Sequence, residues 1–188
     1  MTRISRRLTA LVAVLGMTLM FGCATKIKGP EVGMPHPTIN FGEFTHFELV
    51  HTELNSAYAD NPNNMIALQK VDRNMVVGMC KLIPEMTVVE EGELPSDAPW
   101  TLRVEPFIEE VKYIRWGQRL WSHMFAGKGA IVMRVRYVDA AKGEVIAEPW
   151  FYQHANAVQA GFVPGLSDNL MLNRVVWAIS DYTGDNWK

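Results

Sequence analysis

Histidines and carboxylates are the residues with which a metal or catalytic site would begin. The histidines of the sequence are His36, His46, His51, His123 and His154. His46 and His51 are an odd number of positions apart near a predicted strand, so their side chains would face opposite sides. His51 and Glu53 would share a face, but two ligands are too few for zinc, which takes three or four. The spacing therefore favours solvated or hydrogen-bonded histidines.

A carboxylate-rich loop contains Glu90, Glu91, Glu93 and Asp97. A pair of carboxylates can act as general acid and base when burial raises the pKa of one of them. No apolar residues near this loop would bury a carboxylate, so we expect a solvated loop. Glu109 and Glu110 would face opposite sides of an extended chain and favour the same interpretation.

Nucleotide-binding and hydrolase motifs are not matched. Gly127-Lys128-Gly129 departs from the phosphate-binding pattern G-x-x-x-x-G-K-[ST], and we interpret its glycines as a bend or bulge before a strand. No serine lies in a Gly-x-Ser-x-Gly sequence. We therefore expect no cofactor, no metal site and no enzymatic activity.

The two cysteines are Cys23 and Cys80. Cys80 lies in an apolar stretch, and a reactive thiol would need a cation or base placed specifically to lower its pKa, which the sequence does not indicate, so we expect a buried thiol. Cys23 follows a basic segment (Arg3, Arg6 and Arg7) and an uncharged apolar run, residues 8–20. That run is shorter than the roughly 20 residues of a membrane-spanning helix and is typical of a secretion signal.

The junction Met20-Phe21-Gly22-Cys23-Ala24 resembles the lipobox of bacterial lipoproteins. That resemblance implies cleavage after Gly22 and attachment of diacylglycerol and palmitate chains to Cys23. Each buried methylene adds about 0.8 kcal/mol, so several acyl chains hold a protein firmly on a membrane. The alternatives are a plain cleaved signal with an incidental cysteine and an uncleaved membrane anchor.

Ala24 and the charge balance bear on location and partners. Lipoproteins retained in the inner membrane often carry Asp after the cysteine, so Ala24 favours the outer membrane, with the domain facing the periplasm. The chain has 18 Lys and Arg against 20 Asp and Glu, and removing residues 1–22 makes it more acidic. Without a basic cluster, nucleic acid is a poor partner.

Aromatic and basic residues gather between Tyr113 and Phe125. Trp116, Arg119, Trp121 and His123 belong to residue types that are frequent in interfaces. A second aromatic group is Trp150-Phe151-Tyr152, whose members must point to both sides of a strand. We take the first group as the candidate interaction surface, with burial in the core as the alternative.

The elements that would carry these residues follow from periodicity. Residues 24–38 are rich in Gly and Pro and predict a tether. Strands are expected at 39–50, 85–90, 100–105, 130–139 and 144–154, with a break or an edge position at Pro106 and a hairpin turn at 139–143. A helix is expected from Pro62, capped by Asn61, to the residues before Pro84, and a second one after a Ser167 cap. We therefore predict a signal (1–22), a lipidated tether (23–38) and one α+β domain (39–188), mostly antiparallel, with two main helices on one face.

The second half of the chain resembles an uncharacterised family of bacterial envelope lipoproteins. The resemblance rests on Leu102–Pro106, Gly127–Ala130 and the hairpin Val138–Ala147. It implies the same fold and location, but the family's domain is of unknown function and supplies no reaction.

These observations favour a membrane-anchored, non-enzymatic accessory or protein-interaction domain, bound to the membrane through Cys23 and to an envelope protein. One alternative is a periplasmic hydrolase or metal-dependent enzyme that uses His123, His154 and the glutamate-rich loop. The other is a carrier of a small ligand or lipid, which would need an apolar cavity.

Overall fold

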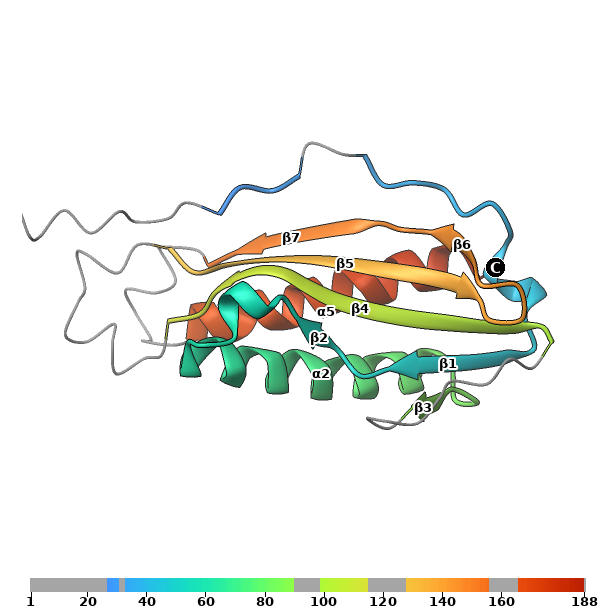
Figure 1. Ribbon diagram of the computed structural model, residues 1–188, viewed down its shortest axis with the longest axis horizontal. Helices are drawn as coiled ribbons and strands as arrows, with labels where there is room; N and C mark the ends of the chain where they lie inside the picture. Colours follow the sequence, from blue (N-terminus) through green and yellow to red (C-terminus); the bar gives the residue numbers. More distant parts are fainter. Residues whose placement is uncertain (1–26, 31–32, 90–98, 115–127, 156–165, 188) are drawn as a thin grey trace, which may run out of the picture.

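The computed structural model describes residues 27–30, 33–89, 99–114, 128–155 and 166–187. They form an α+β fold, which confirms the predicted class (Figure 1). The helices are α2 (Pro62–Leu82) and α5 (Leu166–Asp185), with short 3-10 turns η1 (Phe41–Glu43) and η2 (Ser56–Tyr58). The strands are β1 (His46–Val50), β2 (Glu53–Leu54), β3 (Thr87–Val89), β4 (Thr101–Lys112), β5 (Ala130–Asp139), β6 (Glu144–Ala147) and β7 (Trp150–His154).

The strands form one open sheet built around β4 and β5. Within the described residues the order is β3-β1-β4-β5-β6, with β2 also pairing with β4 and β7 with β5. The β4–β5, β5–β6 and β5–β7 ladders are antiparallel. The β1–β3, β1–β4 and β2–β4 ladders are parallel. The sheet is thus mixed, and its long central ladder is antiparallel as predicted.

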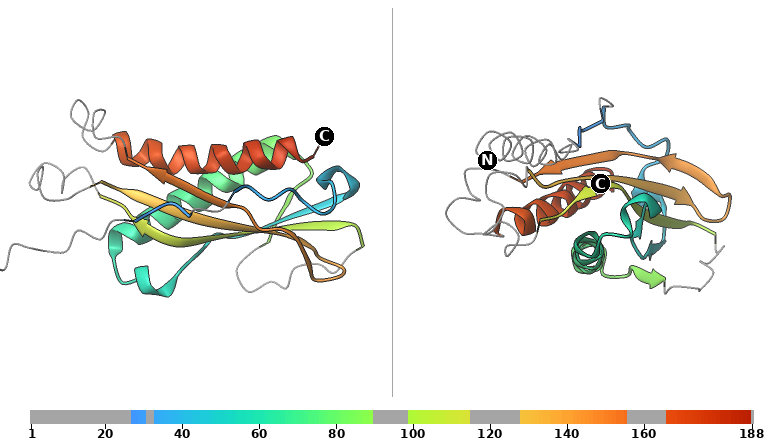
Figure 2. Two further views of the ribbon diagram at one scale, coloured as in Figure 1. Left: turned by 90° about the horizontal axis from the view of Figure 1, so that it is seen from above. Right: turned by 60° about the vertical axis from the view of Figure 1, so that its left-hand side comes forward.

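Both helices pack on the same face of the sheet, as predicted (Figure 2). The alternation along β5 fixes this face, because Ile131, Met133, Val135 and Tyr137 are each 0% exposed. Apolar residues at helical spacing face them: Ala67, Val71, Met75 and Met79 from α2, and Met171, Leu172, Val175, Val176 and Ile179 from α5. The buried Tyr137 hydroxyl lies 2.6 Å from Thr183 Oγ1, so its polar group is satisfied within the core.

The helix boundaries follow the predicted signals with one exception. The side chain of Asn61 accepts a hydrogen bond from the Asn63 N–H, and Pro62 begins α2. The helix ends at Leu82, before Ile83-Pro84. Helix α5 begins at Leu166, so Ser167 lies inside the first turn and does not precede it as a cap.

Of the two alternatives for Pro106, the structure shows an edge position and not a break, because β4 continues through it to Lys112. Residues 101–104 of β4 pair with β1, and Phe107 and Ile108 pair with β2. Pro106 falls between these two partners, at a place where that edge of β4 has no neighbour. A residue without an N–H is tolerated at such a position.

Two other predicted strands are interrupted. The return strand divides into β6 and β7 around Glu148-Pro149, and the Pro149 carbonyl accepts a hydrogen bond from the Val135 N–H. The strand predicted for 39–50 starts only at His46, because Asn40 caps the turn η1. Phe41, Phe47 and Leu49 are nevertheless all buried in the main core.

The described N-terminal residues run along the β7–β6 edge of the sheet (Figures 1 and 2), beginning on the face opposite the helices. Ile27 packs with Ala130 and Val132, and with the partly buried Trp150 and Tyr152. Gly29 is required there, since a Cβ atom would lie 2.8 Å from the Tyr152 ring. Further along, the Tyr182 hydroxyl donates to the Pro35 carbonyl at 2.7 Å and the Thr38 N–H donates to the Ile146 carbonyl at 3.1 Å. Described residues of the segment predicted as a tether therefore pack on the domain.

The β5–β6 hairpin is closed by Asp139. Its carboxylate accepts hydrogen bonds from the N–H groups of Ala141 and Lys142 and pairs with the Lys142 ammonium at 2.9 Å. Gly143 has a φ of 67°, which glycine adopts without strain. The hydrogen bond from the Lys142 side chain is the main cause that holds the pKa of Asp139 below its ordinary value.

We expect Asp139→Asn to lower the free energy of unfolding by about 1–2 kcal/mol at pH 7. Because the pKa of Asp139 is lower in the folded protein, its contribution is present above the unfolded-state pKa of about 3.9 and is lost as the pH falls through the folded value. Urea unfolding of both proteins between pH 7 and pH 2 should show the difference shrinking below pH 4. A difference that stays constant over that range would contradict this role.

Candidate interaction surface on the open sheet face

The face of β4 and β5 that points away from the helices carries a row of charged side chains. Arg103, Glu105, Phe107 and Glu109 alternate with the buried positions of β4, and Arg134 and Arg136 alternate with those of β5. Cross-strand pairing places Glu105 opposite Arg136 and Phe107 opposite Arg134. Charges of opposite sign and an aromatic ring thus become direct neighbours on this face.

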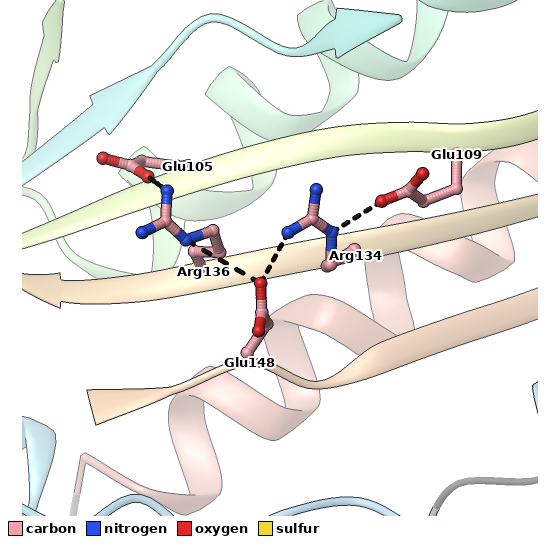
Figure 3. A network of polar contacts seen from close by, with 5 residues as sticks. All are labelled: Glu105, Glu109, Arg134, Arg136 and Glu148. Carbon is pink, nitrogen blue, oxygen red and sulfur yellow. Dashed lines mark hydrogen bonds and ion pairs between the residues drawn. The ribbon is translucent and has the colours of Figure 1, made fainter. Parts of the chain in front are cut away.

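Five of these side chains form one connected set, which we call the sheet network: Glu105, Glu109, Arg134, Arg136 and Glu148 (Figure 3). Arg134 donates from Nε to Glu109 Oε1 and from Nη1 to Glu148 Oε1, both at 2.6 Å. Arg136 Nη1 lies 3.0 Å from Glu105 Oε2, and Arg136 Nε lies 3.7 Å from Glu148 Oε1. Glu148 therefore connects the two arginines.

Arg134 occupies the centre of the sheet network. Its guanidinium carbon lies 5.4 Å from the centre of the Phe107 ring and 5.8 Å from that of the Trp150 ring, within the range of cation–π attraction. Burial lowers the pKa of Arg134, but the hydrogen bonds to Glu148 and Glu109 outweigh it and raise the pKa above its ordinary value. The guanidinium is permanently charged and fixed in position.

The network is partly exposed and almost balanced in charge. The exposed fractions of its side chains run from 20% for Glu109 to 40% for Arg136. On the same face, Arg103 Nε lies 3.2 Å from Glu48 Oε2, so this arginine is paired as well. A polyanion is held by clusters of cations free to neutralise phosphates. Among the described residues, Arg103, Arg134 and Arg136 of this face are all paired, so they do not form such a cluster.

Most residues singled out from the sequence lie outside the described part of the chain. Cys23 does, and so do Trp116, Arg119, Trp121, His123 and the carboxylate group at 90–97. The aromatic run of β7 is described and divides as expected. Phe151 is 1% exposed in the main core, whereas Trp150 and Tyr152 lie on the opposite face.

The described histidines do not gather into a site. His154 stacks on Tyr152 with ring centres 5.8 Å apart, and His51 Nδ1 lies 2.8 Å from Asp72 Oδ2. Asp72 also accepts the Thr52 N–H at 2.7 Å, so this carboxylate holds α2 against the chain between β1 and β2. No local pattern predicts this pair, because its members are 21 positions apart. In the described ranges, no three His, Cys, Asp or Glu residues are grouped so that they could hold a metal ion.

Two further features of the sequence can be placed. The Cys80 side chain is partly buried against the main core, close to the predicted burial. A Cβ atom at Gly129 would collide with the buried carboxylate of Asp168 and would lie 3.1 Å from the Lys112 carbonyl. Gly129 thus allows a close approach at the start of β5.

A hollow of about 680 Å³ lies beside the start of α2, next to the end of β4. Its lining is mixed: the apolar or aromatic residues are Ile27, Ala57, Tyr58, Pro62 and Val111, and the polar ones are Asp60, Asn61, Asn64 and Lys112. The carrier alternative stays a prediction.

No protein-family model matches the sequence, and a search of curated proteins also found no match. Among solved structures, protein XCC0632 from Xanthomonas campestris, of the family DUF330, is similar with a TM-score of 0.51 at 11% identity, over 86% of this chain and 96% of that one. At this identity the likeness shows the fold alone: the chain has an α+β architecture also found in a DUF330 protein.

Two weaker similarities are to the PelC dodecamer from Paraburkholderia phytofirmans and to a minor lipoprotein from Acinetobacter baumannii. PelC has a TM-score of 0.43 at 12% identity, over 84% of this chain and 94% of that one. The lipoprotein has a TM-score of 0.38 at 10% identity, over 74% and 93%. Scores of this size support no inference about this chain. Among the described helices, none has the length and apolar character needed to cross a bilayer.

We expect Arg134→Met to lower the free energy of unfolding by about 1–3 kcal/mol, because Glu109 and Glu148 would lose their charged donor. Arg73→Met, at an exposed position of α2, is the matched control and should change stability by no more than about 0.5 kcal/mol. Adding Glu109→Gln to Arg134→Met should recover part of the loss. Urea unfolding of the four proteins measures these differences, and equal losses for the two arginine variants would contradict the role of Arg134.

Proposed function

We propose that the chain is a membrane-anchored lipoprotein of the bacterial envelope. In this proposal, residues 1–22 are removed and Cys23 carries the acyl chains, with the folded domain facing the periplasm from the outer membrane. The support is the order of a basic segment, a short apolar run and a Gly-Cys junction. Ala24 supports the outer membrane over the inner one.

The domain acts as a non-enzymatic accessory module that binds an envelope protein through its open sheet face. The observation that carries this proposal is the position of Arg134, held by two glutamates between Phe107 and Trp150 on a partly exposed surface. Arginine and tryptophan dominate the binding energy of protein interfaces. Here they are fixed before any partner arrives, which lowers the entropic cost of binding.

The sheet network also indicates the character of the partner surface. Three carboxylates and two guanidiniums alternate across β4, β5 and the Glu148 connection. A complementary surface would offer hydrogen-bonding groups of both signs, and pairing of this kind contributes more to specificity than to affinity. We expect binding to weaken moderately with salt, without the steep dependence of phosphate recognition.

The anchor is tested by mass spectrometry of the full chain isolated from a Gram-negative host. We expect the first peptide to begin at Cys23 with a diacylglycerol modification. Cys23→Ser should abolish the modification and retain the signal segment, whereas the control Cys80→Ser should be modified like the wild type. A first peptide that contains Leu11, or an unmodified Cys23 thiol after cleavage elsewhere, would refute the proposal.

The binding face is tested by photo-crosslinking in intact cells. A photoreactive phenylalanine replaces Phe107 or Trp150, whose aromatic character it keeps, and Gln69 on the exposed side of α2 serves as the control position. Both face positions should yield one and the same protein adduct, which Arg134→Glu should reduce several-fold and position 69 should not form. Uncrosslinked protein at both face positions, or an adduct that is independent of Arg134, would refute the proposed face.

A further inference from the structure

The outer side of the helix pair contains a groove of about 510 Å³ between α2 and α5. The two helices run in the same direction, because residues that come later in α2 contact residues that come later in α5. Asn74 Nδ2 donates to Asn173 Oδ1 at 2.9 Å, and a Cβ at Gly78 would lie 3.4 Å from Val176. Further on, a Cβ at Gly184 would lie 3.4 Å from Leu82. Figures 1 and 2 show the two helices side by side under the sheet.

Large apolar side chains are concentrated on this groove. Val77 is 64% exposed, Trp177 is 58% exposed and Leu82 is 37% exposed. All three line the groove, whereas the other exposed large apolar residues of the described chain, Met34, Met65, Trp100 and Val145, do not. Apolar groups gathered in one place mark a surface that another molecule covers.

Two opposite charges lie at the same end of the groove. Lys81 follows Val77 by one turn on α2, and Asp181 follows Trp177 by one turn on α5. Both side chains are exposed, and neither has an ion-pair partner in the part of the chain that the structure describes. Because the helices are parallel, the cation and the anion lie at similar heights on opposite sides of the groove.

We infer that this groove binds a second copy of the chain, with the two-fold axis parallel to the helices. Such an axis places α2 of one copy over α5 of the other at the same height. Lys81 of each copy then faces Asp181 of the other copy, and Val77 of each copy faces Trp177 of the other. The same surface of the protein therefore forms both sides of the interface. The surface is distinct from the open sheet face, and the inference does not depend on the function proposed for that face.

Other occupants fit the groove less well. A two-fold axis perpendicular to the helices would carry Lys81 to the opposite end of the groove, away from Asp181. An anionic membrane would attract Lys81 but would repel the neighbouring Asp181. The pattern of apolar centre and paired opposite charges is complementary to itself.

The first test measures the mass of the purified full-length protein in density-matched detergent by analytical ultracentrifugation. We expect a dimer whose dissociation constant rises at least about tenfold in Trp177→Ala, as for a buried aromatic anchor. Trp100→Ala is the matched control, because Trp100 is 62% exposed and lies away from the groove. A dimer formed only by shared micelles would survive both substitutions. That result, or a monomer at all concentrations, would overturn the inference.

The second test reverses the charges. Lys81→Asp and Asp181→Lys alone should each raise the dissociation constant about fivefold or more, since each places like charges opposite one another. The double variant restores both pairs and should return to within about threefold of the wild type. A double variant as weak as the single ones would overturn the proposed axis.

Discussion

The structure depends on the strict alternation of side chains along β4 and β5. One face of this ladder supplies the residues that pack under both helices, and the other carries the arginines and glutamates. A slip of one residue would bring Arg134 and Arg136 into the core and expose Met133 and Val135. The cost of burying a guanidinium without a partner is several kcal/mol, so the register admits no alternative.

The sheet network contributes to the fold as well as to the surface. Its ion pairs are half-buried, and pairs at such positions add modestly to stability while specifying one arrangement. Arg134 contacts Glu109 on β4, Glu148 between β6 and β7, and the Trp150 ring on β7. It therefore fixes the divided return strand relative to the centre of the sheet. The same immobility makes the face suitable for recognition.

Local sequence patterns predicted the helices and strands, whereas the sheet network is assembled by the pairing of strands that are distant in the sequence. Period-two alternation predicted β5 with its bounds, and Asn61-Pro62 predicted the start of α2, because both signals lie within a few residues. The alternation along β5 also directs Arg134 and Arg136 away from the core. Their partners are distant in the sequence: Glu109 is 25 positions from Arg134, and Glu105 is 31 positions from Arg136. Only the pairing of β4 with β5 brings them together. The choice between a break and an edge position at Pro106 also depends on long-range pairing, because β4 lacks a neighbour on one side at that point.

The packed N-terminal residues have a mechanical consequence for the proposed anchor. Ile27 is already 6% exposed against the sheet, and only four residues follow Cys23 up to that point. A chain of four residues spans at most about 14 Å, whereas fifteen free residues would span about 50 Å. With acyl chains on Cys23, the domain is held close above the lipid headgroups with restricted tilt. The height and orientation of the domain above such a membrane would then be set by the packing of Ile27 against the sheet.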